Sequence, residues 1–277
     1  MTISAVLSVF NEEARIDATL RSFAWCDEIV ILDKTSMDRT LEIARRYTDK
    51  ILVVPWREFR PEEFRLELER VSSEWVFKIT ASNLIHPELA AQIRELTQRV
   101  DFPYDVIHVP FRRFVLGLET KRSPWHSELF PLVYRRRVAR VNEKSVHGAL
   151  TFDTKRHYRL PRSSDYCMYH LTHPTADEMM ERHIRYWRAE ARTSSGKTSL
   201  RKAFADVMRS IFTVFCRRKT WLMGWDGIAL SMAFLSYFMM QFVYIWEKQR
   251  SKAPQTYQNI RESVARIWEK SEGPKHV

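Results

Sequence analysis

Two short stretches of sequence decide the fold of this chain: AVLSVFNEE at residues 5–13 and ILDKTSMDRT at residues 31–40. In each, a strand-length apolar run ends in polar loop residues that precede a helical pattern. Further apolar runs lie at residues 51–54 and 75–79, and helical patterns at residues 12–23, 38–47, 61–71 and 87–96. Strands and helices alternating at this spacing predict an α/β fold with a doubly wound, mostly parallel sheet and flanking helices.

The pattern changes in the second half of the chain. Residues 106–170 hold strand-like pieces separated by basic clusters, and the sequence after Thr175 is helical to its end. We therefore expect an α/β domain over residues 1–175, followed by a C-terminal helical region over residues 176–277.

A binding site is expected at the carboxyl ends of the strands, because open α/β sheets bind their ligands there. The loops to inspect follow Phe10, Leu32 and Ile79. Asp33 closes the second strand, where an acidic residue of a βαβ unit can accept a hydrogen bond from a ribose or a base. Taken alone, Asp33 has an alternative interpretation as an ordinary turn residue.

The chain is basic: its 277 residues include 45 Lys and Arg against 34 Asp and Glu, a formal net charge of +11. Such a balance favours an anionic partner, which is a nucleic acid, an acidic membrane leaflet or a phosphorylated substrate. The alternative is a solvated basic surface without a partner. The basic residues are spread along the chain and form no recognised nucleic-acid-binding module, so no nucleic acid is expected as partner.

Cysteine usage and the first residues of the chain bear on its location. Cys26, Cys167 and Cys216 are scattered without CxxC spacing, which favours a reducing compartment over a disulfide framework or a zinc site. Residues 1–10 lack the basic start of a signal peptide and run directly into a strand pattern. We therefore expect a cytoplasmic protein.

The two deciding stretches resemble the family 2 glycosyltransferases, in particular the lipopolysaccharide-core glucosyltransferase-like branch. That branch has Asn-Glu-Glu after its first strand, as here at residues 11–13, and Asp-Ser-Gly-Ser-Thr-Asp-Arg-Thr, which aligns without a gap to residues 33–40. The matching residues are Asp33, Ser36, Asp38, Arg39 and Thr40, whereas Lys34, Thr35 and Met37 differ. The similarity continues through Val146-His147, the helix at residues 186–191 and Gly224-Trp225-Asp226-Gly227 before an apolar helix.

The resemblance implies a GT-A fold and a nucleoside-diphosphate sugar as donor, of UDP type. The sugar would pass to a saccharide or lipid-linked acceptor in envelope polysaccharide or lipopolysaccharide biosynthesis. It assigns Asn11, Glu12, Asp33 and Ser36 to the donor pocket. No cofactor other than the donor substrate is expected.

The sequence departs from the family where the metal-binding carboxylates belong. In place of Asp-Ala-Asp-Glu it has Thr80-Ala81-Ser82-Asn83, and hydroxyl and amide groups are poor substitutes for the charged oxygen ligands of Mg²⁺. No metal site is therefore expected. Gly148 also stands where the family has the Glu of Val-His-Glu. Either the protein transfers sugar without a metal, or it keeps the fold as a non-catalytic binding or scaffold protein.

Lys78, Thr80 and Ser82 are expected on one face of the fourth strand if that strand continues through them. Lys78 would then bring positive charge to the space of the missing metal, beside the donor diphosphate. The alternative is that Lys78 reaches solvent from the sheet edge. His147 is the candidate catalytic base, since imidazole takes up a proton near neutral pH, or else a structural histidine.

Other basic residues are candidates for binding phosphate. Arg112, Arg113 and the run at residues 135–137 suit a diphosphate or a phosphorylated acceptor, but such clusters are equally often solvated faces.

The most apolar segment, residues 227–246, is expected to lie on the membrane surface. Basic residues flank it at 217–219 and at 248–252, and they attract an anionic leaflet. Its Trp, Phe and Tyr content suits the interface. We therefore expect a peripheral protein at the inner face of the cytoplasmic membrane. Its length also permits a membrane span, and a buried core helix is a further alternative.

Overall fold

The computed structural model describes residues 1–56, 62–141, 150–162, 166–194 and 196–271. Strands and helices alternate in its N-terminal part, as predicted. The elements are β1 (Ile3–Val9), α1 (Ile16–Phe23), β2 (Glu28–Asp33), α2 (Thr40–Ala44), β3 (Ile51–Val53), α3 (Glu62–Arg70), β4 (Trp75–Lys78), β5 (Asn83–Ile85) and α4 (Pro87–Gln98).

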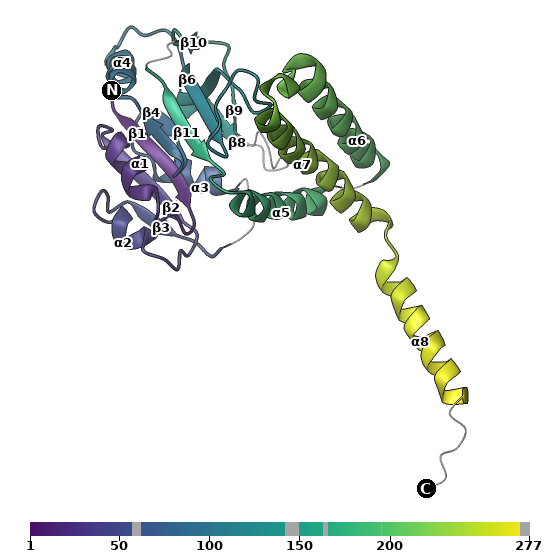
Figure 1. The fold of residues 1–277 in the computed structure, drawn as a ribbon. Coiled ribbons are helices and arrows are strands. Elements are labelled where there is room, and N and C mark those ends of the chain that lie inside the picture. The colour runs from purple at the N-terminus through teal and green to yellow at the C-terminus, as the bar shows by residue number, and fades with distance from the viewer. Residues whose placement is uncertain (57–61, 142–149, 163–165, 195, 272–277) are drawn as a thin grey trace.

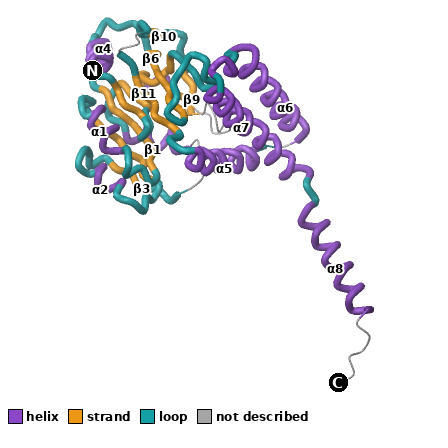
Figure 2. Tube along the Cα trace, in the orientation of Figure 1, coloured by secondary structure: helices purple, strands orange, loops and turns teal. Residues whose placement is uncertain are grey.

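The next part adds the strands that complete the sheet (Figures 1 and 2). They are β6 (Val106–Val115), β7 (Leu129–Arg135), β10 (His157–Arg159) and β11 (Met168–Thr172). The strand order is β3-β2-β1-β4-β7-β6-β11-β5, with β10 paired to β6. Most pairs are parallel, whereas β7 runs antiparallel to β4 and β6, and β5 runs antiparallel to β11. A separate two-stranded sheet joins β8 (Ala139–Val141) and β9 (Leu150–Phe152).

The core lies between the sheet and its helices. All six residues of β2 are buried, as expected of a parallel strand covered on both faces. Helix α1 buries Ile16, Thr19, Leu20 and Phe23, which are spaced at i, i+3, i+4 and i+7 and so share one face. The Phe23 ring meets Phe77 of β4 edge-on, with 5.1 Å between ring centroids. This packing fixes the strand ends that carry the candidate site.

The chain after β11 is helical. The helices are α5 (Ala176–Thr193), α6 (Gly196–Phe212), α7 (Trp225–Arg250) and α8 (Ala253–Ser271), with a π-helical turn at Thr213–Arg217 and a 3-10 turn at Thr220–Met223 between α6 and α7. Helices α5, α6 and α7 pack together beside the sheet, whereas α8 extends away from the body (Figure 1).

Gly227 allows the 3-10 turn to approach α7 closely. A Cβ at this position would lie 1.9 Å from the backbone oxygen of Thr220, so no other residue fits without moving the turn. The helix expected from residue 227 begins earlier, at Trp225. The Gly-Trp-Asp-Gly motif therefore forms the first turn of α7 and its contact with the preceding turn.

Helix α7 is not a core helix. Its buried residues are Gly227, Leu230, Ser231 and Ile245, whereas Trp225 is 85% exposed and Met232 is 69% exposed. By length and composition it is a helix that could cross a membrane, with 17% of its most apolar window buried in the protein. The buried-helix alternative from the sequence is therefore wrong, because the apolar side chains outnumber those that α5 and α6 cover.

Candidate functional site

Asp33 is the last residue of β2 and has no solvent exposure. The Ser36 N–H donates to its Oδ2 atom over 3.0 Å. Its Oδ1 atom is inaccessible to solvent and has no hydrogen-bond partner within the described part of the chain. A buried carboxylate oxygen without a donor is costly, and the contacts of the described residues give no account of this atom.

The loops after β1 and β2 are joined by hydrogen bonds that involve the predicted donor-pocket residues. The Asn11 N–H donates to Ser36 Oγ over 3.0 Å, and Asn11 Oδ1 accepts from the Met37 N–H over 2.8 Å. The Glu12 N–H donates to Thr40 Oγ1 over 2.7 Å. Asn11 has a φ of 52°, and α1 begins at Ile16, later than the sequence pattern indicated. The structure thus brings Asn11, Glu12, Asp33 and Ser36 together.

Asp38, one of the residues that match the family motif, connects the loops after β1 and β2. Its carboxylate accepts from the backbone N–H groups of Glu13 and Thr40, each over 3.0 Å. Burial raises the pKa of Asp38, but the hydrogen bonds from Thr40 and Glu13 outweigh that effect and lower it below 3.8. In return, Glu13 accepts from the Arg39 N–H. These residues hold the two loops in register.

Lys78 is engaged inside the protein. Its Nζ atom lies 2.5 and 2.6 Å from the two carboxylate oxygens of Glu67, and 5.0 Å from the centroid of the Phe64 ring. Glu67 is 2% exposed and also accepts from Ser8 Oγ over 2.6 Å. The charge of Lys78 is therefore balanced by a buried carboxylate, so the alternative that it merely reaches solvent is wrong.

The expectation that Lys78, Thr80 and Ser82 share a strand face is also wrong. Strand β4 ends at Lys78, and the chain then turns: the Asn83 N–H donates to the Thr80 carbonyl over 3.0 Å, and the Thr80 N–H donates to Asn83 Oδ1 over 2.8 Å. Thr80 is exposed and Ser82 is buried. Without a continuing strand, alternation places no two of these side chains on one face.

The residues at this turn do not fit a divalent metal. Thr80, Ser82 and Asn83 present hydroxyl and amide oxygens but no carboxylate, and Asn83 Oδ1 already accepts from Thr80. Mg²⁺ is held in proteins by carboxylates together with phosphate oxygens and water. Among the residues that the structure describes, no group of three His, Cys, Asp or Glu is arranged to hold a metal.

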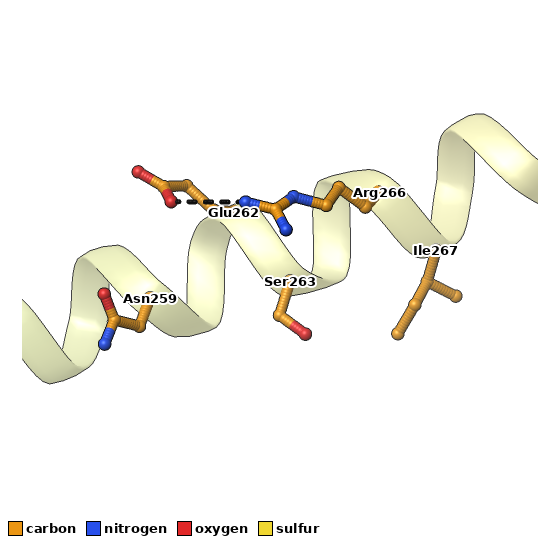
Figure 3. Close-up of a pocket in the computed structure, with 5 residues that line it drawn as sticks. All are labelled: Asn259, Glu262, Ser263, Arg266 and Ile267. Atoms are coloured by element: carbon orange, nitrogen blue, oxygen red, sulfur yellow. Dashed lines mark ion pairs between the residues drawn. The ribbon is translucent and has the colours of Figure 1, made fainter.

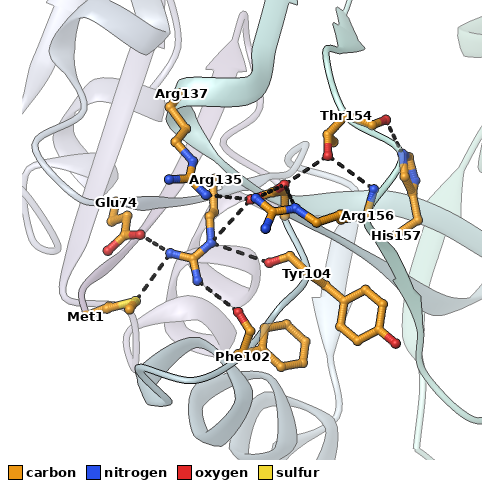
Figure 4. Close-up of polar contacts among 10 residues, drawn as sticks. Met1, Glu74, Phe102, Tyr104, Arg135, Arg137, Thr154, Arg156 and His157 are labelled. Carbon is orange, nitrogen blue, oxygen red and sulfur yellow. Dashed lines mark hydrogen bonds and ion pairs between the residues drawn. The ribbon is translucent and has the colours of Figure 1, made fainter.

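Two further sequence predictions concern a histidine and an arginine run. His147, the predicted base, and the neighbouring Gly148 lie outside the described residues. The run Arg135–Arg137 contacts other parts of the protein: Arg135 and Arg137 bind Asp105 (Figure 4). Arg136 donates to the Val71 carbonyl over 2.8 Å. Arg135 is therefore a buried structural residue, whereas Arg136 and Arg137 are exposed and also hold the fold through these contacts. Arg112 is paired with Glu119 over 3.1 Å.

His170 reaches the same turn from β11, and no sequence motif predicted this position. Asn83 Nδ2 lies 2.9 Å from His170 Nδ1, because β5 pairs with β11 and sets Asn83 opposite His170. Strand β5 has three residues, and no local pattern predicts its partner. Only the long-range pairing reveals this contact.

A shallow hollow on α8 is not part of this site. It is lined by Asn259, Glu262, Ser263, Arg266 and Ile267, all from one helix, with Arg266 and Glu262 ion-paired over 3.8 Å (Figure 3). A single helix supplies no opposing wall and so cannot enclose a nucleotide. The candidate site is therefore the edge of the sheet where β1, β2 and β4 end.

Comparison with known proteins identifies relatives of the chain. LpsC of Rhizobium meliloti (strain 1021), a lipopolysaccharide core biosynthesis glycosyltransferase, is 30% identical over 106 residues, which are 36% of this chain and 39% of LpsC. An uncharacterized glycosyltransferase of Rickettsia typhi is 33% identical over 92 residues, which are 33% of this chain and 31% of that protein. The chain thus matches well under two thirds of the length of these curated relatives.

Among solved structures, S. aureus TarS 1–349 in complex with UDP-GlcNAc is similar at 16% identity and a TM-score of 0.47, over 87% of this chain and 82% of that one. The model of glycosyl transferase family 2 matches residues 4–154. The mostly parallel sheet, its flanking helices and the helices that follow agree with the expected GT-A fold. Because the family match covers more than half of the chain and includes both site loops, this protein belongs to glycosyl transferase family 2.

Proposed function

We propose that this protein transfers a sugar from a nucleoside-diphosphate sugar, of UDP type, to a saccharide or lipid-linked acceptor. The reaction forms a bond from the acceptor oxygen to the anomeric carbon and breaks the bond from that carbon to the donor phosphate. The electron pair leaves with the nucleoside diphosphate, and the acceptor hydroxyl gives up its proton to a base. The similarity to LpsC supports a role in lipopolysaccharide or envelope polysaccharide assembly.

The observation that carries this proposal is the unpartnered Oδ1 atom of Asp33. It lies at the carboxyl end of a parallel strand, where doubly wound sheets bind nucleotides. An N–H or O–H of the base or ribose would supply the missing donor. Asn11, Glu12 and Ser36 take part in the hydrogen bonds that join the surrounding loops, which supports a donor pocket at this edge.

Asp33→Asn tests the donor pocket. Its amide oxygen can still accept from Ser36, so the NH₂ group must take the place of Oδ1 and offers a donor where the ligand needs an acceptor. A hydrogen bond to a charged group contributes about 1.5–3 kcal/mol. Calorimetry should therefore show UDP binding about tenfold to a hundredfold weaker. Asp49→Asn, which makes the same change of charge at an exposed site, is the control. Unchanged UDP affinity in Asp33→Asn would contradict a donor pocket at Asp33.

We also propose that transfer needs no divalent metal, since the turn at Thr80 offers no carboxylate. The measurement is release of UDP from UDP-sugars with a saccharide acceptor, in EDTA and then with added Mg²⁺ or Mn²⁺. Activity that appears only with metal would contradict metal independence. Nucleotide binding without turnover on any acceptor would favour the non-catalytic scaffold. The variant His147→Ala, measured in the same assay, tests whether His147 is the catalytic base.

A peripheral position at the inner face of the cytoplasmic membrane is part of the proposal. Exposed Trp225 and Met232 on α7 and exposed Trp221 beside them give an apolar surface, and the basic residues at 217–219 adjoin it. Each basic residue near an anionic leaflet adds about 1 kcal/mol. Alkaline carbonate should strip the protein from membranes, whereas release by detergent alone would indicate a spanning helix.

A further inference from the structure

A row of polar side chains crosses the sheet beside the turn at Thr80. The strand register places Asn83 of β5 opposite His170 of β11, and His170 opposite Arg113 of β6. Directly opposed residues in neighbouring strands share one face of a sheet. The three side chains therefore form a row that starts where the family carries its metal-binding carboxylates.

Two more arginines belong to this region. Arg182 of α5 donates to Thr172 Oγ1 over 3.5 Å, at the end of β11. Arg15 immediately precedes α1. Burial first, and then the positive charges of Arg113, Arg182 and Arg15, lowers the pKa of His170 to about 3. We name Arg15, Arg113, His170, His173 and Arg182 the open arginine cluster.

The open arginine cluster has little negative charge of its own. Arg15 is paired with Glu12. Arg113 makes no hydrogen bond or ion pair with any described residue, its Nε atom is inaccessible to solvent, and its guanidinium lies 5.2 Å from the centroid of the Phe130 ring. Nor does the described part of the chain give Arg182 a carboxylate partner. A largely desolvated guanidinium without a carboxylate, as in Arg113, is stabilised by a bound anion, and half-buried Arg182 lies in the same region.

His170 can donate to that anion. The Thr80 N–H is a donor only, so Asn83 turns its oxygen to Thr80 and its NH₂ group to His170. His170 Nδ1 therefore accepts, and in the neutral ring the proton is on Nε2. At neutral pH the ring is uncharged, as its low pKa requires. His173, 9% exposed, adds an Nδ1 atom that has no partner among the described residues.

We propose that Arg113, Arg182 and His170 form a phosphate-binding subsite that supplies the positive charge a divalent ion supplies elsewhere in the family. The ligand is a phosphate or diphosphate group, carried by the donor or by a phosphorylated acceptor. Phosphate binding by this subsite is independent of the proposed function, whereas the role of the subsite in sugar transfer rests on it. There, the guanidinium groups stabilise the charge that develops on the leaving diphosphate.

The test measures binding of three probes by calorimetry in EDTA: uridine, UDP and inorganic pyrophosphate. Arg182→Gln and Arg113→Gln should each weaken pyrophosphate and UDP about tenfold or more, and leave uridine unchanged. Arg112→Gln is the control for β6, because Arg112 already has Glu119 as partner. Arg188→Gln, exposed on α5, is the control for Arg182.

The outcomes separate this inference from the donor pocket. If Asp33→Asn loses uridine binding but binds pyrophosphate normally, the result bears on the donor pocket and not on the phosphate-binding subsite. Pyrophosphate that competes with UDP identifies the donor diphosphate as the ligand, whereas pyrophosphate that binds the UDP-saturated protein identifies the acceptor side. Pyrophosphate binding that is unchanged in both arginine variants, or equally reduced in the controls, overturns the subsite. If Arg113→Gln does not fold, Arg182→Gln, on a partly exposed helix position, decides.

Discussion

Two arginine clusters in this protein show what a central carboxylate does. In the first, Arg137 and Arg156 lie 2.8 and 2.7 Å from the carboxylate of Asp105, and Arg135 lies 3.6 Å from it (Figure 4). In the open arginine cluster, Arg113 and Arg182 have no described carboxylate between them. The first cluster is complete without a ligand and joins β6, β7 and β10. The second is complete only with an anion.

In the Asp105 cluster, both the carboxylate and the arginines have partners within the protein. The Asp105 side chain is 2% exposed, and Arg135 also donates to the carbonyls of Phe102 and Tyr104 and stacks on Trp75 at 4.5 Å. Burial raises the pKa of Asp105, but hydrogen bonds from Arg137, Thr154 and Arg156 outweigh it and lower the pKa below 3.8. Every charge there has a partner, so the arginines serve the fold.

Asp105→Asn should give the largest effect, because it removes the buried carboxylate that Arg135, Arg137 and Arg156 share, although Arg135 keeps its ion pair with Glu74. Breaking a buried pair costs about 3–5 kcal/mol, and we expect about 3 since Arg137 and Arg156 are more than half exposed. Urea unfolding measures the loss. Asp153→Asn, which removes the exposed partner of Arg140, should cost less than about 1 kcal/mol. Equal losses in the two variants would contradict the contrast between the clusters.

The pH dependence of stability should also separate the clusters. Burial first lowers the pKa of His170 and of His173 to about 3, whereas the unfolded rings take up protons near pH 6.5. The unfolded chain then binds more protons, so stability falls as the pH drops from 6.5 towards 3. The contribution of Asp105 is present above pH 3.8 and is lost only as the pH falls further.

Urea unfolding at pH 7 and pH 5 measures this effect. Between these values the loss is about 2 kcal/mol per histidine. His170→Asn should reduce the loss by that amount, because one proton-binding group is gone from the unfolded chain. A variant that loses as much stability as the native protein between these two values would show that His170 is not held neutral by the cluster.

Arg113→Met should give the smallest change. Methionine keeps the apolar contact with Phe111 and Phe130, while an unpaired cation is removed. We expect the free energy of unfolding to change by less than about 1 kcal/mol, or to rise. The same variant should lose pyrophosphate binding. A large loss of stability would mean that Arg113 has a structural partner, as Arg135 does.

The alternation of strands and helices in the first hundred residues was predictable, because buried parallel strands read as apolar runs and the helices bury residues at helical spacing. It was enough to bring Asn11 and Asp33 to one edge of the sheet. The short strands β5, β8, β9 and β10 were not predicted individually, because elements of three residues carry no local signal. The ion pair of Lys78 was not predictable from the sequence, because its partner Glu67 lies on α3, in another part of the chain.

The sequence by itself determined the α/β class, the family motif in the two loops and the absence of carboxylates at residues 80–83. The tertiary structure decided which basic residues are available to a ligand. Arg113 and Arg135 are alike in sequence, each in an apolar strand beside other arginines. Asp105 reaches Arg135 across the sheet, and no carboxylate among the described residues reaches Arg113. The availability of a charge depends on its neighbours in space, which residue order does not specify.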